Sequence, residues 1–152
     1  MKIILFLSLL IWVIPGFGKV KIQKPKSQHV TAFAIIVDEM TLEKTGGAVE
    51  AYRDALEADG LSTYIVSGNW KNPDEVKAEI IKLNKRKPVL EGVVFIGDIP
   101  VALIRNAQHM TTAFKMNEDE FPFPESSVPS DRFYDDLHLT FDFICQDSVN
   151  TS

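Results

Sequence analysis

Three apolar runs alternate with helix-like segments, and this alternation constrains the fold more than any other feature of the chain. Residues 31–37, 61–66 and 92–96 are rich in β-branched and other apolar side chains. Runs of this length are typical of strands buried on both faces. Between them, apolar residues recur at helical spacing, namely Ala48, Val49, Tyr52, Ala55 and Leu56 in the first interval and Val76, Ile80, Ile81 and Leu83 in the second. The pattern predicts strand, helix, strand, helix, strand.

Turn and capping residues indicate where the two helices begin and end. The glycine pair 46–47 is expected to be the turn that leads into the first helix, and Gly60 follows its last turn. The second helix has a stronger start signal, because Asn72 can cap it, Pro73 suits its first position and Glu75 completes a capping box.

This order predicts an α/β fold with an open, mostly parallel sheet flanked by helices. Strand–helix–strand connections within one sheet cross over right-handed, so the helices cover its faces. After residue 100 the pattern changes: we expect a short helix or loop over 101–114, a surface excursion over 117–130 and a strand with one buried face over 137–144. Without a linker or repeat, residues 30–152 are expected to form one α/β subdomain that ends before its fold is complete.

The N-terminal segment, residues 1–18, is interpreted as a secretory signal peptide. A lysine precedes a nearly unbroken apolar run, and small residues precede an expected cleavage site after Gly18. A membrane-spanning helix needs about 20 apolar residues, whereas this run is shorter and is interrupted by Pro15. We therefore expect no stable membrane span and a location outside the cell, in the periplasm or at the cell surface. Residues 19–29 are expected to be a basic, solvated lead-in.

Charge and cysteine content exclude several classes of function. The 152 residues carry a formal charge of −5, so the chain has no broad basic surface and nucleic acid is not an expected partner. Its one cysteine cannot form an internal disulfide or a multi-cysteine zinc site. The sequence also lacks the glycine-rich phosphate loops, the zinc-protease helix motif and the paired-cysteine motif. Composition thus excludes classes without naming an activity.

Polar residues at the ends of the expected strands are the first site candidates. Ligands of open α/β sheets bind outside the carboxyl ends of the strands, and those ends carry Asp38, Ser67 and Asp98 here. The two aspartates resemble the acidic, magnesium-holding site of response-regulator receiver domains, although aspartate at a strand end is also ordinary turn chemistry. A small acidic ligand-binding protein is therefore one interpretation, and a signal peptide argues against the receiver.

His109, His138 and Cys145 are the candidates for nucleophilic chemistry. A cysteine nucleophile needs a base that generates its thiolate. Cys145 lies at the expected end of a strand without a glycine-rich approach, so we expect a small buried residue rather than half of a catalytic dyad.

Two segments resemble the front subdomain of the catalytic domain of gingipain-type cysteine peptidases. Residues 92–100 are similar to that family's apolar strand closing in Gly-Asp with Ile-Pro nearby, and residues 129–137 resemble its Ser/Thr-Asp-x-x-Tyr segment with trailing acids. The resemblance extends over residues 32–137 and implies a caspase-like α/β fold in a secreted peptidase. In that family the catalytic histidine, usually before glycine, and the catalytic cysteine follow the second segment, in the next subdomain.

The resemblance transfers no catalytic residue to this chain. No His-Gly dipeptide occurs, and neither the histidines nor Cys145 match the family's catalytic positions. The chain is expected to be the N-terminal portion of a secreted gingipain-like cysteine peptidase, inactive alone and completed by a C-terminal catalytic subdomain of the same protein, or else a truncated remnant. The alternative is a non-catalytic secreted α/β binding module.

Four aspartates raise the possibility of a calcium site near the second segment. Asp131, Asp135 and Asp136 offer hard oxygen ligands, and Asp98 is expected to approach them because both segments should lie near the carboxyl edge of the sheet. The alternative is that Asp131 caps a turn or pairs with an arginine while the other two are solvated. Both interpretations stay open at this stage.

Overall fold

The computed structural model describes residues 20–105, 120 and 127–146 of the chain. Its main element is a four-stranded sheet with the order β1-β3-β2-β4. The strands are β1 (Lys21–Gln23), β2 (Thr31–Asp38), β3 (Leu61–Gly68) and β4 (Val89–Ile96). Strand β2 pairs in parallel with both β3 and β4, whereas β1 pairs antiparallel with β3. The expected α/β fold with a mostly parallel sheet is confirmed.

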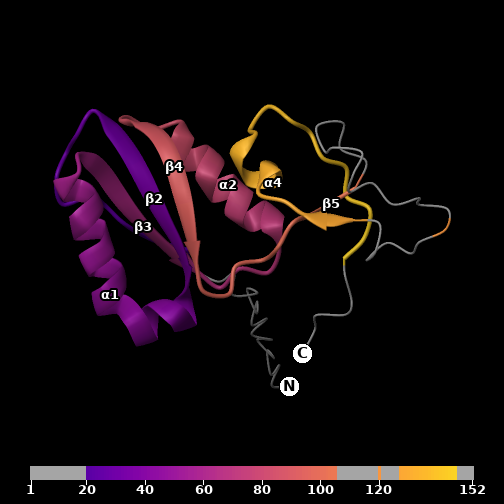
Figure 1. Ribbon diagram of the computed structural model, residues 1–152, viewed down its shortest axis with the longest axis horizontal. Helices are drawn as coiled ribbons and strands as arrows, with labels where there is room; N and C mark the ends of the chain where they lie inside the picture. Colours follow the sequence, from indigo (N-terminus) through magenta and orange to yellow (C-terminus); the bar gives the residue numbers. More distant parts are fainter. Residues whose placement is uncertain (1–19, 106–119, 121–126, 147–152) are drawn as a thin grey trace, which may run out of the picture.

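Helices cover both faces of this sheet, α1 (Glu39–Ala58) on one side and α2 (Pro73–Asn84) on the other (Figure 1). Ile35, Val37 and Ile65 pack with Val49 of α1. The opposite face of the sheet contributes Ala32, Ala34, Ile36 and Val66 to a second cluster, and α2 contributes Val76, Ile80 and Leu83 to it. This two-sided burial explains why β2 has no polar alternation, since its successive side chains enter opposite cores.

Helix α1 begins seven residues earlier than the glycine pair at 46–47 predicts. The reason is local: Asp38 caps the helix by accepting a hydrogen bond from the Thr41 N–H through Oδ1 at 2.8 Å. Thr45, with φ −124° and ψ 15°, kinks the helix just before the glycines, which lie inside it. Gly60, at φ 93°, follows the helix as expected.

Helix α2 starts as the sequence predicts. Asn72 Oδ1 accepts from the Glu75 N–H at 3.0 Å, and Pro73 is the first helical residue. Glu75 reaches back one residue further than in a capping box and accepts from the Lys71 N–H at 3.0 Å. Val76 and Ile80 are buried against the sheet.

The lead-in is not a solvated tail, because it supplies β1 and is anchored to α1. The Lys26 and Ser27 N–H groups donate to the buried carboxylate of Glu57 at 2.9 and 3.0 Å, and the Ser27 hydroxyl donates to it as well. Lys26 also pairs with Asp54 at 2.8 Å. The basic composition of the lead-in predicts exposure to solvent. Instead, its backbone N–H groups at Lys26 and Ser27 find hydrogen-bond acceptors in the buried carboxylate of Glu57.

The chain beyond β4 differs from its prediction in two places. Within 101–114, the described part forms strand β5 (Leu103–Ile104), which pairs antiparallel with β6 (Val128–Pro129); the rest of that segment, and most of the 117–130 excursion, lies outside the described residues. Helix α4 (Arg132–Asp135) follows. The strand predicted over 137–144 is wrong, because no described strand lies beside it and Phe143 is 79% exposed.

Candidate functional site

The carboxyl edge of the sheet brings Asp38 and Asp98 together. The Asp98 N–H donates to Asp38 Oδ2 at 2.8 Å, so the end of β4 is tied to the end of β2. Asp38 is buried, whereas Asp98 is exposed to solvent. Ser67, the third polar residue at this edge, is buried near the end of β3.

Both carboxylate oxygens of Asp38 are occupied by backbone donors. Burial by itself would raise the pKa of this carboxyl, but hydrogen bonds from Thr41 and from the Asp98 N–H hold it below its ordinary value. A carboxylate that is buried, ionised and paired with N–H groups serves as a helix cap and as a link between strands. This geometry favours the turn-chemistry interpretation over a receiver-like acceptor.

The turn after β4 requires glycine at position 97, both for its backbone conformation and for the space available. Its φ is 86°, a conformation that favours glycine. A Cβ atom there would lie 1.9 Å from Asp38 Oδ2 and 2.4 Å from Thr41 Oγ1. Any side chain would therefore displace the carboxylate that links the two strands.

The two segments that carry the gingipain resemblance contact each other. The Tyr134 hydroxyl donates to the Pro100 carbonyl, and the Ser130 N–H donates at 3.0 Å to the carbonyl of Ala102, two residues beyond the first segment. The Tyr134 ring lies 4.8 Å from that of Phe95 and is 4% exposed. Burial, with a smaller effect of nearby aspartates, raises the pKa of Tyr134, so its hydroxyl remains a donor.

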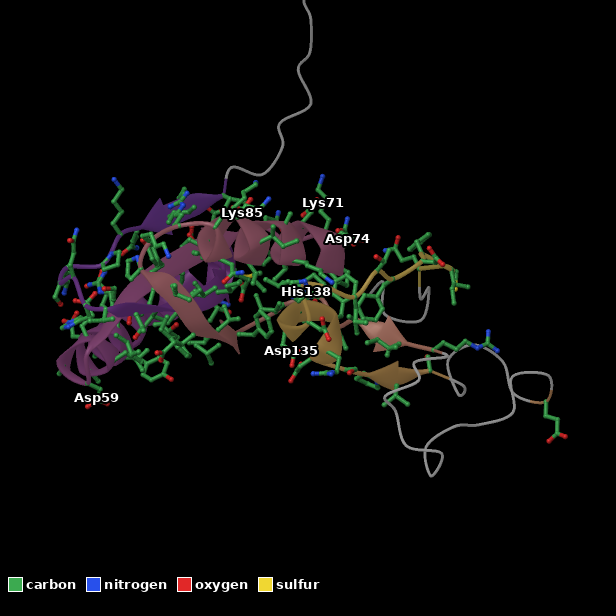
Figure 2. The ribbon with its side chains drawn as sticks, turned by 90° about the horizontal axis from the view of Figure 1, so that it is seen from above. Asp59, Lys71, Asp74, Lys85, Asp135 and His138 are labelled. Atoms are coloured by element: carbon green, nitrogen blue, oxygen red, sulfur yellow. The ribbon has the colours of Figure 1, made fainter. Side chains whose placement is uncertain are left out.

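The acidic residues around α4 are compensated chiefly by an arginine. Arg132 lies 3.7 Å from both Asp135 Oδ2 and Asp136 Oδ2. Asp136 Oδ1 also accepts from the His138 N–H at 3.1 Å. Asp131 occupies the position before α4 without a side-chain capping bond. Asp135 and His138 lie on this segment beside α2 (Figure 2), around an open hollow.

Calcium binding at this segment stays a prediction. Within residues 20–105, 120 and 127–146, no three His, Cys, Asp or Glu side chains are grouped closely enough to hold a metal ion. The segments of Asp98 and Asp131 are joined through the Tyr134 and Ser130 hydrogen bonds described above. Arg132 pairs with Asp135 and Asp136 rather than with Asp131, which neither of the two sequence interpretations anticipates.

An aromatic clamp on Lys77 is the feature that sequence reasoning missed. Its Nζ lies 4.6 Å from the Phe133 ring centroid and 4.8 Å from that of Phe141. Burial lowers the pKa of Lys77, although the negative charges of Asp136, Asp74 and Asp135 act to raise it. These contacts attach the segment that contains α4 to α2. The spacing of the three residues in the sequence does not predict them.

The thiol and imidazole candidates form no described dyad. Cys145 and His138 are both exposed, and no hydrogen bond joins them in the described part of the chain. The expectation of a buried cysteine is therefore wrong, since its segment forms no strand that could enclose it. His109 lies outside the described residues.

Comparisons with protein-family models, with curated proteins and with solved structures find no match to this chain. Within the described residues, none of the helices has the length and apolar character that crossing a bilayer requires. The signal peptide expected over 1–18 lies outside that part.

Proposed function

We propose that this chain is the front, non-catalytic part of a secreted gingipain-like cysteine peptidase. The observation that carries the proposal is the contact between residues 92–100 and 129–137, the two segments of the resemblance. The Tyr134 hydroxyl on the Pro100 carbonyl and the Tyr134 ring on Phe95 join residues that lie more than thirty positions apart in the sequence. Each segment alone is a weak signal, and their mutual packing supports reading them as one unit.

The role proposed for this part is scaffolding. The Asp38 carboxylate fixes the turn at Gly97 and Asp98, and Tyr134 fixes the chain two residues further on. A rigid carboxyl edge of this kind positions the loops that leave it, which is where α/β enzymes place their substrates. The scaffold would present its edge to a C-terminal catalytic subdomain of the same protein.

Catalysis is assigned to that other subdomain. A thiol protease needs a thiolate, an oriented base and oxyanion donors. Cys145 is exposed, and the described residues place no oriented histidine base beside it. The chain by itself is therefore proposed to be inactive.

The reading frame downstream of codon 152 tests the proposal most directly. We expect it to continue and to encode a His-Gly dipeptide and a later cysteine. The product of that longer frame should react with a thiol-directed covalent peptidase inhibitor, and its histidine and cysteine variants should not cleave peptides. A stop codon directly after Ser152 would overturn the proposal and favour the secreted binding module instead.

A further inference from the structure

The turn that joins α2 to β4 presents a run of basic side chains. Lys85, Arg86 and Lys87 are consecutive, all three are exposed, and they follow the last turn of α2. Figure 2 shows Lys85 at the opposite end of this helix from Asp74. The helix dipole favours cations at a helix C-terminus, so the basic run by itself indicates no binding partner.

Two exposed valines lie at the same end of the sheet. Val30, which precedes β2, is 90% exposed, and Val89, the first residue of β4, is 49% exposed. Because Thr31 pairs with Val89, the two valines lie at the amino ends of neighbouring strands, next to the basic turn. Cations and apolar side chains are thus exposed together at one corner of the molecule. We call this surface the amino corner, and its residues are Val30, Lys85, Arg86, Lys87 and Val89.

We propose that the amino corner attaches the protein to the surface of an anionic lipid bilayer. Lysine and arginine side chains bind acidic headgroups, and exposed valines enter the boundary between headgroups and acyl chains. A soluble polyanion would bind the cations but would leave the valines in water, so it fits this surface less well. The corner lies at the other end of the strands from the carboxyl edge, and the inference does not depend on the proposed function.

The negative charge of the whole chain is compatible with this contact. The formal charge is −5, but exposed charges farther apart than about 10 Å are largely screened at about 0.1 M salt. Asp59, at the end of α1, lies well away from Lys85 (Figure 2). Glu91 is exposed two residues after Val89 and opposes binding locally. The contact is therefore expected to be weak, reversible and sensitive to salt.

Co-sedimentation of the chain, purified from a secreting host, with lipid vesicles tests the proposal. We expect more binding to vesicles of phosphatidylcholine and phosphatidylglycerol than to phosphatidylcholine alone, and the excess should fall as salt is raised. The comparison with neutral vesicles cancels any contribution from the apolar run within residues 1–18. Equal binding to the two kinds of vesicle, or binding to neither, would overturn the proposal.

Charge variants test whether the amino corner makes the contact. Arg86→Gln and Lys87→Gln should each weaken binding to the anionic vesicles about fivefold at low salt, because each removes one positive charge. Lys44→Gln removes an exposed lysine near the start of α1, at the other end of the sheet, and is the matched control that should bind like wild type. Glu91→Gln should strengthen binding. Corner variants that bind as well as the control would place the contact elsewhere and refute the assignment.

A valine variant separates a lipid surface from a soluble polyanion. Val30→Ser should weaken vesicle binding several-fold, because serine gains less than valine from leaving water, and should leave elution from immobilised heparin unchanged. Since Val30 is almost fully exposed, the variant should melt at the temperature of the wild type. Vesicle binding that Val30→Ser does not change and that soluble heparin abolishes would identify a polymer site instead of a lipid site.

Discussion

Replacing Glu57 by glutamine should weaken the fold by detaching the lead-in from α1. The Glu57 carboxylate is 6% exposed and accepts hydrogen bonds from the Lys26 N–H, the Ser27 N–H and the Ser27 hydroxyl. Glutamine has almost the same shape but only one acceptor oxygen, and its amide would place N–H groups against a backbone donor. The variant therefore removes charge and acceptors without opening a cavity.

The expected loss follows from the number of donors left unpaired. The single amide oxygen of glutamine can accept either from the N–H and hydroxyl of Ser27 or from the Lys26 N–H, so at least one charge-assisted hydrogen bond disappears. Such a bond contributes about 1.5–3 kcal/mol, and we expect a loss of about 2 kcal/mol in the free energy of unfolding. With a urea slope of about 2 kcal/mol per molar for a chain of this size, the midpoint should fall by about 1 M.

The loss should depend on pH with a definite sign. Burial alone would raise the pKa of Glu57, but the bonds from Ser27 and Lys26 hold it below its ordinary value of 4.5. A carboxyl with a lowered folded pKa stabilises the fold fully above its unfolded pKa, and the stabilisation disappears as pH falls through the folded value. The difference between wild type and Glu57→Gln should thus be largest at neutral pH and shrink in acid below pH 4.5.

Urea unfolding followed by circular dichroism at a series of pH values is the assay. Glu43→Gln, at an exposed position on the same helix, is the matched control and should change stability little. A loss below about 0.5 kcal/mol at neutral pH, or a difference that stays constant into acid, would refute the reasoning.

Three other outcomes follow from the site. Tyr134→Phe should cost about 1–2 kcal/mol because it leaves the Pro100 carbonyl unpaired, whereas Tyr52→Phe, at a side chain 39% exposed, should be neutral in the same thermal melt. The chain alone should cleave arginyl and lysyl peptides no faster than background, and a rate abolished by Cys145→Ala would contradict this. Calorimetry should detect calcium binding in the millimolar range if Asp131 and its neighbours gather a cation; no heat and no rise in melting temperature would reject that site.

The sequence by itself determined the elements whose signals are local. The apolar runs of β2, β3 and β4 predict parallel strands because burial on both faces leaves no room for polar alternation. The start of α2 was also readable, since Asn72 and Pro73 act within one turn of the chain. The Gly-Asp pair after β4 was visible as a motif, although its reason was not.

Only the tertiary structure decided the contacts between distant residues. Asp38 meets the Asp98 N–H sixty residues away because β2 and β4 are neighbours, and sheet order is not encoded in either segment. The lead-in becomes a strand because β3 offers an edge and Glu57 offers a buried acceptor. The alternation over 137–144 forms no strand because a strand needs a partner, and no described partner lies beside it. Local periodicity indicates which secondary structure a segment can form, and its neighbours in space determine which one it forms.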